Sequence, residues 1–370
     1  MRATRVEISV KNLIHNIEVI RQTSAGCAIM AMIKANGYGH GIVETAKILR
    51  RENIEFLGVA FTDEAVALRN AGDEGAIAVL TPPEPDDAPL FAKYNLRPVI
   101  STLDEAMRLS TAASDAGVEI YAHLYIDTGL SRDGVLPDDI PCLWEKISKL
   151  GGIVWEGCCT HFATADDTNL EFAREQLAKF NGSLAFLAKN GANFRYIHAA
   201  NTGALTQFPE ARFNLVRPGY SLYGLSPASH LDAQLPVKPL LTWKTKILSL
   251  RRIPAGTSVS YGRRYISECE TVIATIPVGY GDGYMRNLSG KQEVLIGGRR
   301  FPTAGVVCMG ECMVDVGDYP VNLGDEVVLI GSQGNETITV AELAANCNTI
   351  GYEIITAISA RVPRIYVIEN

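Results

Sequence analysis

A lysine next to a glycine-rich segment is the first feature of this sequence that could do chemistry. Lys34 ends an apolar run, and the following residues are Ala-Asn-Gly-Tyr-Gly-His-Gly, so that glycines free the backbone just past the amine. A buried lysine has a lowered pKa and can act as a nucleophile that forms an imine with an aldehyde. Taken alone, Lys34 is better explained as a solvated charge at the end of a strand.

Groups that bind anions or handle protons follow several later apolar runs. These groups stand in the segments Asp127-Thr-Gly-Leu-Ser-Arg132, Thr160-His161, His198, Asn201-Thr202-Gly203 and Arg217-Pro-Gly219-Tyr220. The Thr202 hydroxyl and the backbone amides around Gly219 and Tyr220 suit a phosphate group. A lysine for an imine, an arginine for a ring nitrogen and a phosphate site together indicate pyridoxal 5′-phosphate as the cofactor.

The elements that position these groups are predicted from the hydrophobic pattern. Short runs rich in Val, Ile and aromatic residues alternate with segments of helical periodicity. Eight such runs cover residues 28–34, 56–60, 76–80, 98–101, 120–127, 154–162, 196–201 and 213–222. We therefore predict an α/β fold, a (β/α)8 TIM barrel, in which reactive residues lie at the C-terminal ends of the strands.

From Pro236 onward the pattern changes to short alternating strands separated by Gly and Pro, which predicts a C-terminal β-rich domain. The expected domains are a barrel over residues 11–235 that binds pyridoxal 5′-phosphate, and a β-rich domain over residues 236–370 together with residues 1–10.

Composition excludes several classes of protein. The 370 residues are 47% hydrophobic and 20% charged, which is typical of a chain that buries a full core. A net charge of -7 without a basic stripe argues against a nucleic-acid partner. No apolar run approaches the roughly 18 residues of a membrane span and the N-terminus lacks a signal-peptide pattern, so we expect a cytoplasmic protein without a membrane partner. Eight cysteines without paired spacing predict reduced thiols rather than disulfides or a metal site.

The ordered motifs resemble those of alanine racemases, which are fold-type III pyridoxal-phosphate enzymes. The resemblance runs nearly from end to end. It is carried by segments 34–41, 127–132, 160–166, 198–202, 217–220, 259–262, 278–283, 308–309, 351–353 and 359–364.

This resemblance implies a racemase that interconverts L- and D-alanine and supplies D-alanine for peptidoglycan. It implies that Lys34 holds the cofactor as an imine and is one of two proton carriers, and that Tyr261 is the other. The two bases act on opposite faces of the substrate carbon, so the configuration inverts. In the family, Tyr261 enters the active site of the partner subunit, which implies a head-to-tail homodimer.

The resemblance also assigns the contacts to cofactor and substrate. It places Arg217 at the pyridine nitrogen and Arg132 near both the phenolate oxygen and the substrate. Tyr280 and Tyr352 form an inner gate that favours small amino acids, with Arg286 further out, and the backbone of Met309 meets the substrate carboxylate. The remaining cofactor contacts are Tyr38, His161, Asn201, Thr202, Gly219, Tyr220 and Tyr352.

Three positions depart from the family pattern. Gly310 stands where alanine racemases commonly have Asp, Val306 where many have Arg, and Tyr125 where some have a lysine that braces the active-site arginine. The first two changes bear on pocket size and charge, so they keep a serine-accepting or broader amino-acid racemase open as an alternative.

Two further alternatives are weaker. A fold-type III decarboxylase fits the gate tyrosines poorly, and a non-catalytic cofactor carrier would not need Tyr261. The other histidines, His15, His40, His123 and His230, are interpreted as structural.

Overall fold

The computed structural model describes residues 3–368, and these divide into two units. The barrel unit comprises Asn12–Gly37 and Gly41–Pro239. The β-rich unit comprises the described residues of Met1–Lys11, Tyr38–His40 and Leu240–Asn370.

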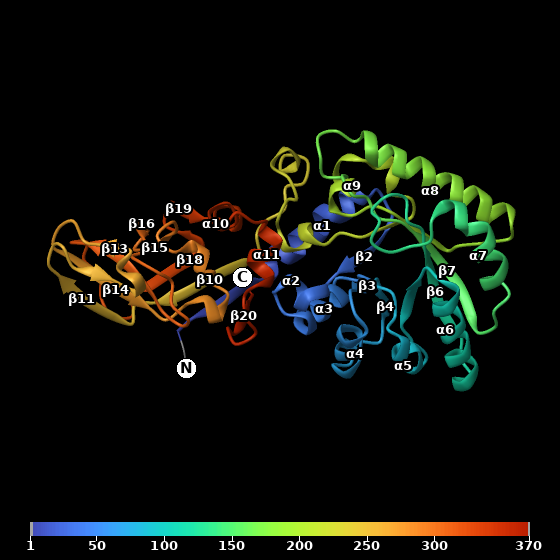
Figure 1. The fold of residues 1–370 in the computed structure, drawn as a ribbon, viewed down its shortest axis with the longest axis horizontal. Helices are drawn as coiled ribbons and strands as arrows, with labels where there is room; N and C mark the ends of the chain where they lie inside the picture. The colour runs from blue at the N-terminus through green and yellow to red at the C-terminus, as the bar shows by residue number, and fades with distance from the viewer. Residues whose placement is uncertain (1–2, 369–370) are drawn as a thin grey trace. The chain divides into compact units, whose positions relative to one another are not determined.

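The barrel unit is built on eight parallel strands in the order β8-β7-β6-β5-β4-β3-β2-β9. The strands are β2 (Ala28–Met32), β3 (Phe56–Val59), β4 (Ala76–Val79), β5 (Arg97–Ile100), β6 (Ile120–Tyr125), β7 (Ile153–Cys159), β8 (Tyr196–His198) and β9 (Leu215–Val216). Figure 1 shows helices lying around the outside of these strands. They are α1 (Val10–Ser24), α3 (Ile42–Arg51), α4 (Thr62–Asn70), α5 (Ala88–Lys93), α6 (Leu103–Ala116), α7 (Ile140–Ile147), α8 (Glu171–Lys189) and α9 (Thr202–Gln207). The prediction of a TIM barrel is confirmed.

Local sequence explains where these elements begin and end. At the start of α6, the Thr102 side chain accepts a hydrogen bond from the Glu105 N–H at 3.2 Å and the Glu105 carboxylate accepts one from the Thr102 N–H at 3.1 Å, which is a capping box. The helix ends at Gly117, whose φ of 64° is left-handed. Strand β9 is shorter than the predicted run 213–222 because Pro218 has no N–H to continue a ladder.

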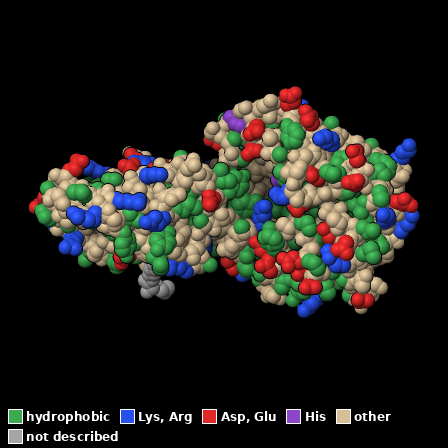
Figure 2. Space-filling view, in the orientation of Figure 1, with side chains coloured by type: hydrophobic (Ala, Val, Ile, Leu, Met, Phe, Trp, Pro, Cys, Tyr) green, Lys and Arg blue, Asp and Glu red, His purple; other side chains and the backbone are tan. Residues whose placement is uncertain are grey.

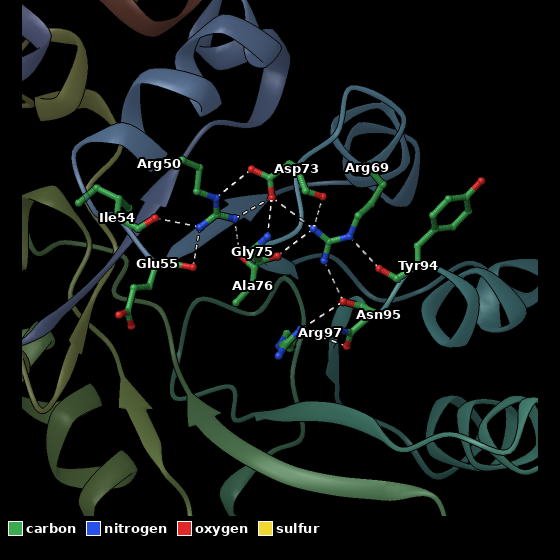
Figure 3. Close-up of polar contacts among 10 residues, drawn as sticks. All are labelled: Arg50, Ile54, Glu55, Arg69, Asp73, Gly75, Ala76, Tyr94, Asn95 and Arg97. Atoms are coloured by element: carbon green, nitrogen blue, oxygen red, sulfur yellow. Dashed lines mark hydrogen bonds and ion pairs between the residues drawn. The ribbon is translucent and has the colours of Figure 1, made fainter.

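A salt-bridged cluster ties together the N-terminal ends of neighbouring strands (Figure 3). Arg50 from α3 pairs with both carboxylate oxygens of Asp73, at 2.8 and 2.9 Å, and also donates to the carbonyls that precede β3. Arg69 from α4 donates to Asp73, Gly75 and Asn95. The cluster lies at the N-terminal end of the barrel strands, where side chains of TIM barrels commonly serve stability.

The β-rich unit contains a large sheet in the order β16-β15-β18-β10-β1-β20, with β19 paired to β18, and a three-stranded sheet β11-β14-β17. The large sheet is formed by β1 (Arg5–Ser9), β10 (Leu241–Lys246), β15 (Glu293–Ile296), β16 (Arg299–Pro302), β18 (Glu326–Gln333), β19 (Glu336–Ile338) and β20 (Arg364–Val367). The other strands are β11 (Ser249–Ile253), β14 (Thr271–Ile276), β17 (Cys312–Gly317) and the pair β12 (Ser258–Val259) and β13 (Tyr265–Ile266). Two helices, α10 (Val340–Cys347) and α11 (Gly351–Thr356), complete the unit. A β-rich domain after the barrel is confirmed.

Surface charges of both signs are interspersed on the face shown in Figure 2. Within residues 3–368, no helix has the length and apolarity needed to cross a membrane. The same residues contain no group of three or more His, Cys, Asp or Glu side chains placed to hold a metal ion. All eight cysteines are free thiols.

Candidate active site

Lys34 begins a strained turn immediately after β2. Ala35, Asn36 and Gly37 have φ values of 52°, 54° and 63°, and two of these three residues are not glycine. Side chains hold the turn: Glu64 accepts a hydrogen bond from the Ala35 N–H at 2.6 Å, and Asn36 accepts one from the Ile42 N–H at 3.0 Å. Strain of this kind persists where surrounding contacts enforce it, commonly at functional sites.

The environment of the Lys34 amine favours its neutral form. Burial is the main cause of its lowered pKa, and the cations of Arg132 and Arg217 lower the pKa further, whereas the Glu64 carboxylate opposes them. A neutral amine is the nucleophilic form. The solvated-charge interpretation of Lys34 is therefore disfavoured by its surroundings.

Arg217 is buried, and four of its N–H groups are used within the barrel. Its Nη1 donates to His198 Nδ1 at 2.6 Å and to the His198 carbonyl at 2.8 Å. Its Nη2 donates to the Thr160 carbonyl at 2.7 Å, to His161 Nδ1 at 3.1 Å and to the Ala199 carbonyl at 3.1 Å. Within residues 3–368 the Nε–H has no hydrogen-bond partner, so this donor is available to a ligand.

The two histidines that contact Arg217 are kept neutral. Burial first, and the Arg217 cation second, hold the pKa of His161 and of His198 well below the ordinary value. Each accepts a hydrogen bond from the guanidinium on Nδ1, so each carries its proton on Nε2.

Thr202 and Gly219 are brought together in the loops after β8 and β9. The Thr202 hydroxyl accepts a hydrogen bond from the Gly219 N–H at 3.2 Å and lies 3.3 Å from the Ser221 hydroxyl. Asn201 caps α9 by accepting from the Ala204 N–H at 3.0 Å. Tyr220 is buried, and burial raises its pKa to about 12. This cluster supplies the hydroxyl and amide donors that a phosphate needs.

Arg132 lies at the rim of the same barrel end. The Asp127 carboxylate fixes its loop by accepting hydrogen bonds from the N–H groups of Gly129 and Ser131 at 2.9 and 3.0 Å. The Arg132 guanidinium is largely exposed and pairs with Asp133 at 3.0 Å. It is close enough to Lys34 and Arg217 to lower the pKa of both.

Tyr38 and Tyr352 meet within the β-rich unit, with ring centroids 6.2 Å apart. The segment Tyr38–His40 packs on α11 so closely that a Cβ on Gly39 would lie 2.0 Å from the Ile355 carbonyl oxygen. Arg364 also donates to the Gly39 carbonyl at 3.0 Å. Gly39 of the lysine motif thus allows the chain to contact α11.

Three adjoining loops of the β-rich unit carry Tyr261, Tyr280 and Met309. The N–H groups of Tyr280 and Gly281 donate to the carbonyls of Cys308 and Met309 at 3.0 and 2.9 Å. Ser260 donates through its hydroxyl to the Val306 carbonyl at 2.7 Å. Tyr261 and Met309 are 72% and 63% exposed, so this chain by itself leaves both residues accessible.

The three departures from the family pattern have distinct surroundings. Tyr125 is buried against Val99 and Cys159, and burial raises its pKa to about 12, so it stays neutral. Val306 is buried, whereas a Cβ on Gly310 would meet no heavy atom within 4 Å. Residue 310 therefore has space for a side chain.

Sequence reasoning interpreted His123 as structural and did not single out Glu156. The structure places Nδ1 of His123 2.7 Å from Nε2 of His198, and Nε2 of His123 3.6 Å from the Glu156 carboxylate. A charged residue within an apolar strand run was the available signal for Glu156. The irregular pairing that aims it inward could not be seen in the sequence.

Comparison with known proteins places both units in one family. The family model described as "Alanine racemase, N-terminal domain" matches residues 8–227, and that described as "Alanine racemase, C-terminal domain" matches residues 240–366. The chain belongs to the alanine racemase family. It is an enzyme of the isomerase class, as the resemblance of its motifs implied.

Similar proteins cover the whole chain. The alanine racemase of Carboxydothermus hydrogenoformans is 42% identical, over 99% of this chain and 100% of the relative. The crystal structure of alanine racemase from Streptomyces lavendulae has a TM-score of 0.95 at 34% identity, covering 100% of this chain and 98% of that one. A histidine racemase from Leuconostoc mesenteroides subsp. sake has a TM-score of 0.91 at 30% identity, covering 99% and 98%.

Proposed function

We propose that this member of the alanine racemase family interconverts L- and D-alanine with pyridoxal 5′-phosphate. The observation that carries the proposal is the Lys34 amine, which has a lowered pKa beside Arg132 and Arg217 in a chain related over its full length to alanine racemases. The donor set fits the cofactor: an amine for its aldehyde, the unused Arg217 Nε–H for its ring nitrogen, and the Thr202 cluster for its phosphate.

When bound, pyridoxal 5′-phosphate supplies an electrophilic aldehyde and a conjugated ring that withdraws electrons from the α-carbon of the substrate. Arg217 would donate to the ring nitrogen and, because it has no proton to transfer at neutral pH, would leave that nitrogen unprotonated. Thr202, Gly219 and Tyr220 would hold the phosphate, and the family resemblance adds Tyr38 and Tyr352. Arg132 and the backbone of Met309 orient the substrate carboxylate.

Two bases then exchange protons at the α-carbon. Tyr261 Oη, as the phenolate, would accept the α-proton of L-alanine from one face, and Lys34 Nζ, in its protonated form, would donate a proton to the opposite face. The reverse reaction uses the same groups in exchanged roles. We propose that Tyr261 comes from the partner subunit of a head-to-tail homodimer, which follows the family resemblance.

A broader or different amino-acid specificity is the second candidate. The histidine racemase among the similar structures and the open space at Gly310 favour it. Serine also remains a candidate, because an apolar pocket rejects an added hydroxyl only weakly.

A racemisation panel on purified, cofactor-loaded protein tests both candidates. L-alanine, L-serine, L-histidine, L-lysine and L-arginine are each followed by chiral chromatography. We expect alanine to react fastest, whereas equal or faster turnover of another amino acid would favour the second candidate. Racemisation of none of them would contradict the proposal.

The proposed role is supply of D-alanine for peptidoglycan in the cytoplasm. Expression of the chain in a bacterium that lacks alanine racemase should restore growth without added D-alanine. Failure to restore growth with active, expressed protein would contradict this role.

A further inference from the structure

A chain of polar side chains crosses the interior of the barrel from Arg217 to the opposite end. Arg217 contacts His198 at 2.6 Å, His198 contacts His123 at 2.7 Å, and His123 lies 3.6 Å from Glu156. Arg97 lies 3.5 Å from the same Glu156 oxygen. His123 and His198 are completely buried, and the Glu156 side chain is 7% exposed.

The direction of each hydrogen bond in this series of side chains follows from Arg217. A guanidinium can only donate, so His198 must accept on Nδ1 and carries its proton on Nε2. That proton is donated to Nδ1 of His123, which therefore carries its own proton on Nε2. This last N–H faces Glu156, so all the donors point from Arg217 toward one carboxylate.

Glu156 faces the cations of Arg97 and Arg195 and the imidazole of His123. Burial would raise the pKa of its carboxyl, but His123, Arg97 and Arg195 outweigh burial and lower it. His123 itself is held neutral by burial, with Arg97 and Arg217 lowering its pKa and Glu156 raising it. The separation of 3.6 Å is too long for a good hydrogen bond, so the pair acts mainly by electrostatic attraction.

Two features of β7 build this arrangement. The register with β6 passes from Ala122 opposite Trp155 to His123 opposite Gly157, so Glu156 is the extra residue of a bulge. A Cβ on Gly157 would lie 2.6 Å from Nδ1 of His123, so the imidazole packs where only glycine leaves room. The bulge turns the Glu156 carboxylate toward the His123 ring, and the missing side chain of Gly157 leaves space for that ring.

We propose that Glu156 and His123 are positioning residues that act on Arg217 through His198. The Glu156 carboxylate orients and polarises the two neutral imidazoles, which hold the guanidinium so that its Nε–H faces the ring nitrogen of the cofactor. The role is electrostatic and not proton transfer, because the Arg217 guanidinium does not release a proton to His198. The proposal rests on the proposed function of Arg217.

The first test is spectroscopic and does not depend on turnover. Histidine side chains of the full-length, cofactor-loaded protein are labelled with 15N, and His123 and His198 are assigned through His123→Gln and His198→Gln. Both should be neutral with the proton on Nε2 from pH 6 to pH 8. Protonation of either ring in this range, or a proton on Nδ1, would overturn the proposal even if the protein racemised alanine.

The second test is kinetic. Glu156→Gln should lower kcat roughly tenfold with little change in KM, by analogy with outer partners of metal-bound histidines, and should shift the absorption maximum of bound pyridoxal 5′-phosphate. Glu156→Asp should recover part of the loss. Glu105→Gln is the matched control, since Glu105 is a buried carboxylate that caps α6, and its loss should leave the absorption maximum unchanged.

A double-variant experiment separates positioning from a purely structural role. In an Arg217→Lys background, Glu156→Gln should change kcat by less than about twofold, because the group through which it acts is already removed. A tenfold effect in that background would overturn the proposal, as would an unchanged spectrum and kcat in Glu156→Gln itself. If unmodified protein racemised nothing while the imidazole spectra were as expected, the proposed function would fail and the side-chain arrangement would stand.

Discussion

The backbone N–H of Ala35, the residue that follows Lys34, donates a 2.6 Å hydrogen bond to the carboxylate of Glu64. The same carboxylate also accepts from the Ala60 N–H at 2.9 Å. It thereby braces the strained turn and places a negative charge near the amine. The Glu64 charge raises the pKa of Lys34, but burial and the cations of Arg132 and Arg217 have the larger effect, so the pKa is lowered.

Opposite pH shifts are therefore expected when the two neighbouring charges are removed. Arg132→Gln should raise the pKa of Lys34 and move covalent attachment of pyridoxal 5′-phosphate to higher pH. Glu64→Gln should lower that pKa further and move attachment to lower pH. Absorbance of the attached cofactor against pH measures both shifts. Arg108→Gln, a substitution in a surface ion pair of α6, is the control without a shift. Shifts of equal sign for Arg132→Gln and Glu64→Gln would contradict this account of the amine.

Mixing two inactive variants tests whether the two bases come from different subunits. Lys34→Ala should lose covalent attachment of the cofactor, and Tyr261→Phe should retain the cofactor but not racemise. If each site combines Lys34 of one subunit with Tyr261 of its partner, heterodimers contain one intact site. Statistical mixing should then restore about a quarter of the unmodified activity, measured by chiral chromatography after co-refolding. Sites built within one subunit would show no recovery.

Thr202→Val should weaken cofactor binding while preserving side-chain shape. The change removes the hydroxyl that accepts from the Gly219 N–H and that would donate to phosphate. Loss of a hydrogen bond to a charged group costs about 1.5–3 kcal/mol, so Kd should rise roughly tenfold or more. Fluorescence titration with pyridoxal 5′-phosphate measures this. Thr206→Val is the control, because Thr206 donates to the Thr202 carbonyl within α9. A similar rise in Kd for both variants would indicate damage to α9 rather than loss of a phosphate contact.

Gly310→Asp should narrow the substrate range toward alanine without destabilising the protein. A Cβ at this position meets nothing within 4 Å, so the side chain fits. The added carboxylate reduces pocket volume and adds negative charge, and both changes disfavour larger substrates. The ratio of kcat/KM for alanine to that for serine should rise, as measured on the same amino-acid panel.

Gly279, which has close neighbours, provides a comparison for the substitutions at Gly310. A Cβ on Gly279 would lie 2.1 Å from the Cys308 carbonyl oxygen, so Gly279→Ala should lower Tm by several degrees, whereas Gly310→Ala should change it by less than about 2 °C. Comparable losses of Tm at both positions would contradict the assignment of open space at Gly310.

The sequence alone determined the family and the barrel, and it predicted most residues of the candidate site. The motifs around Lys34 and Arg217 stand at the ends of apolar runs, and strand ends of a parallel barrel meet at one edge. The grouping of Lys34, Arg217 and Thr202 in one unit therefore follows from local pattern plus one topological rule.

Tertiary structure decided what surrounds those residues. The pKa of Lys34 depends on burial and on charges from Arg132 and Arg217, which are distant in sequence. The chain to Glu156 depends on a bulge in β7 and on the absence of a side chain at Gly157, because a register of two strands is a property of their pairing. Sequence periodicity reports which residues are buried, but contacts between buried polar groups form only when separate strands close into a barrel.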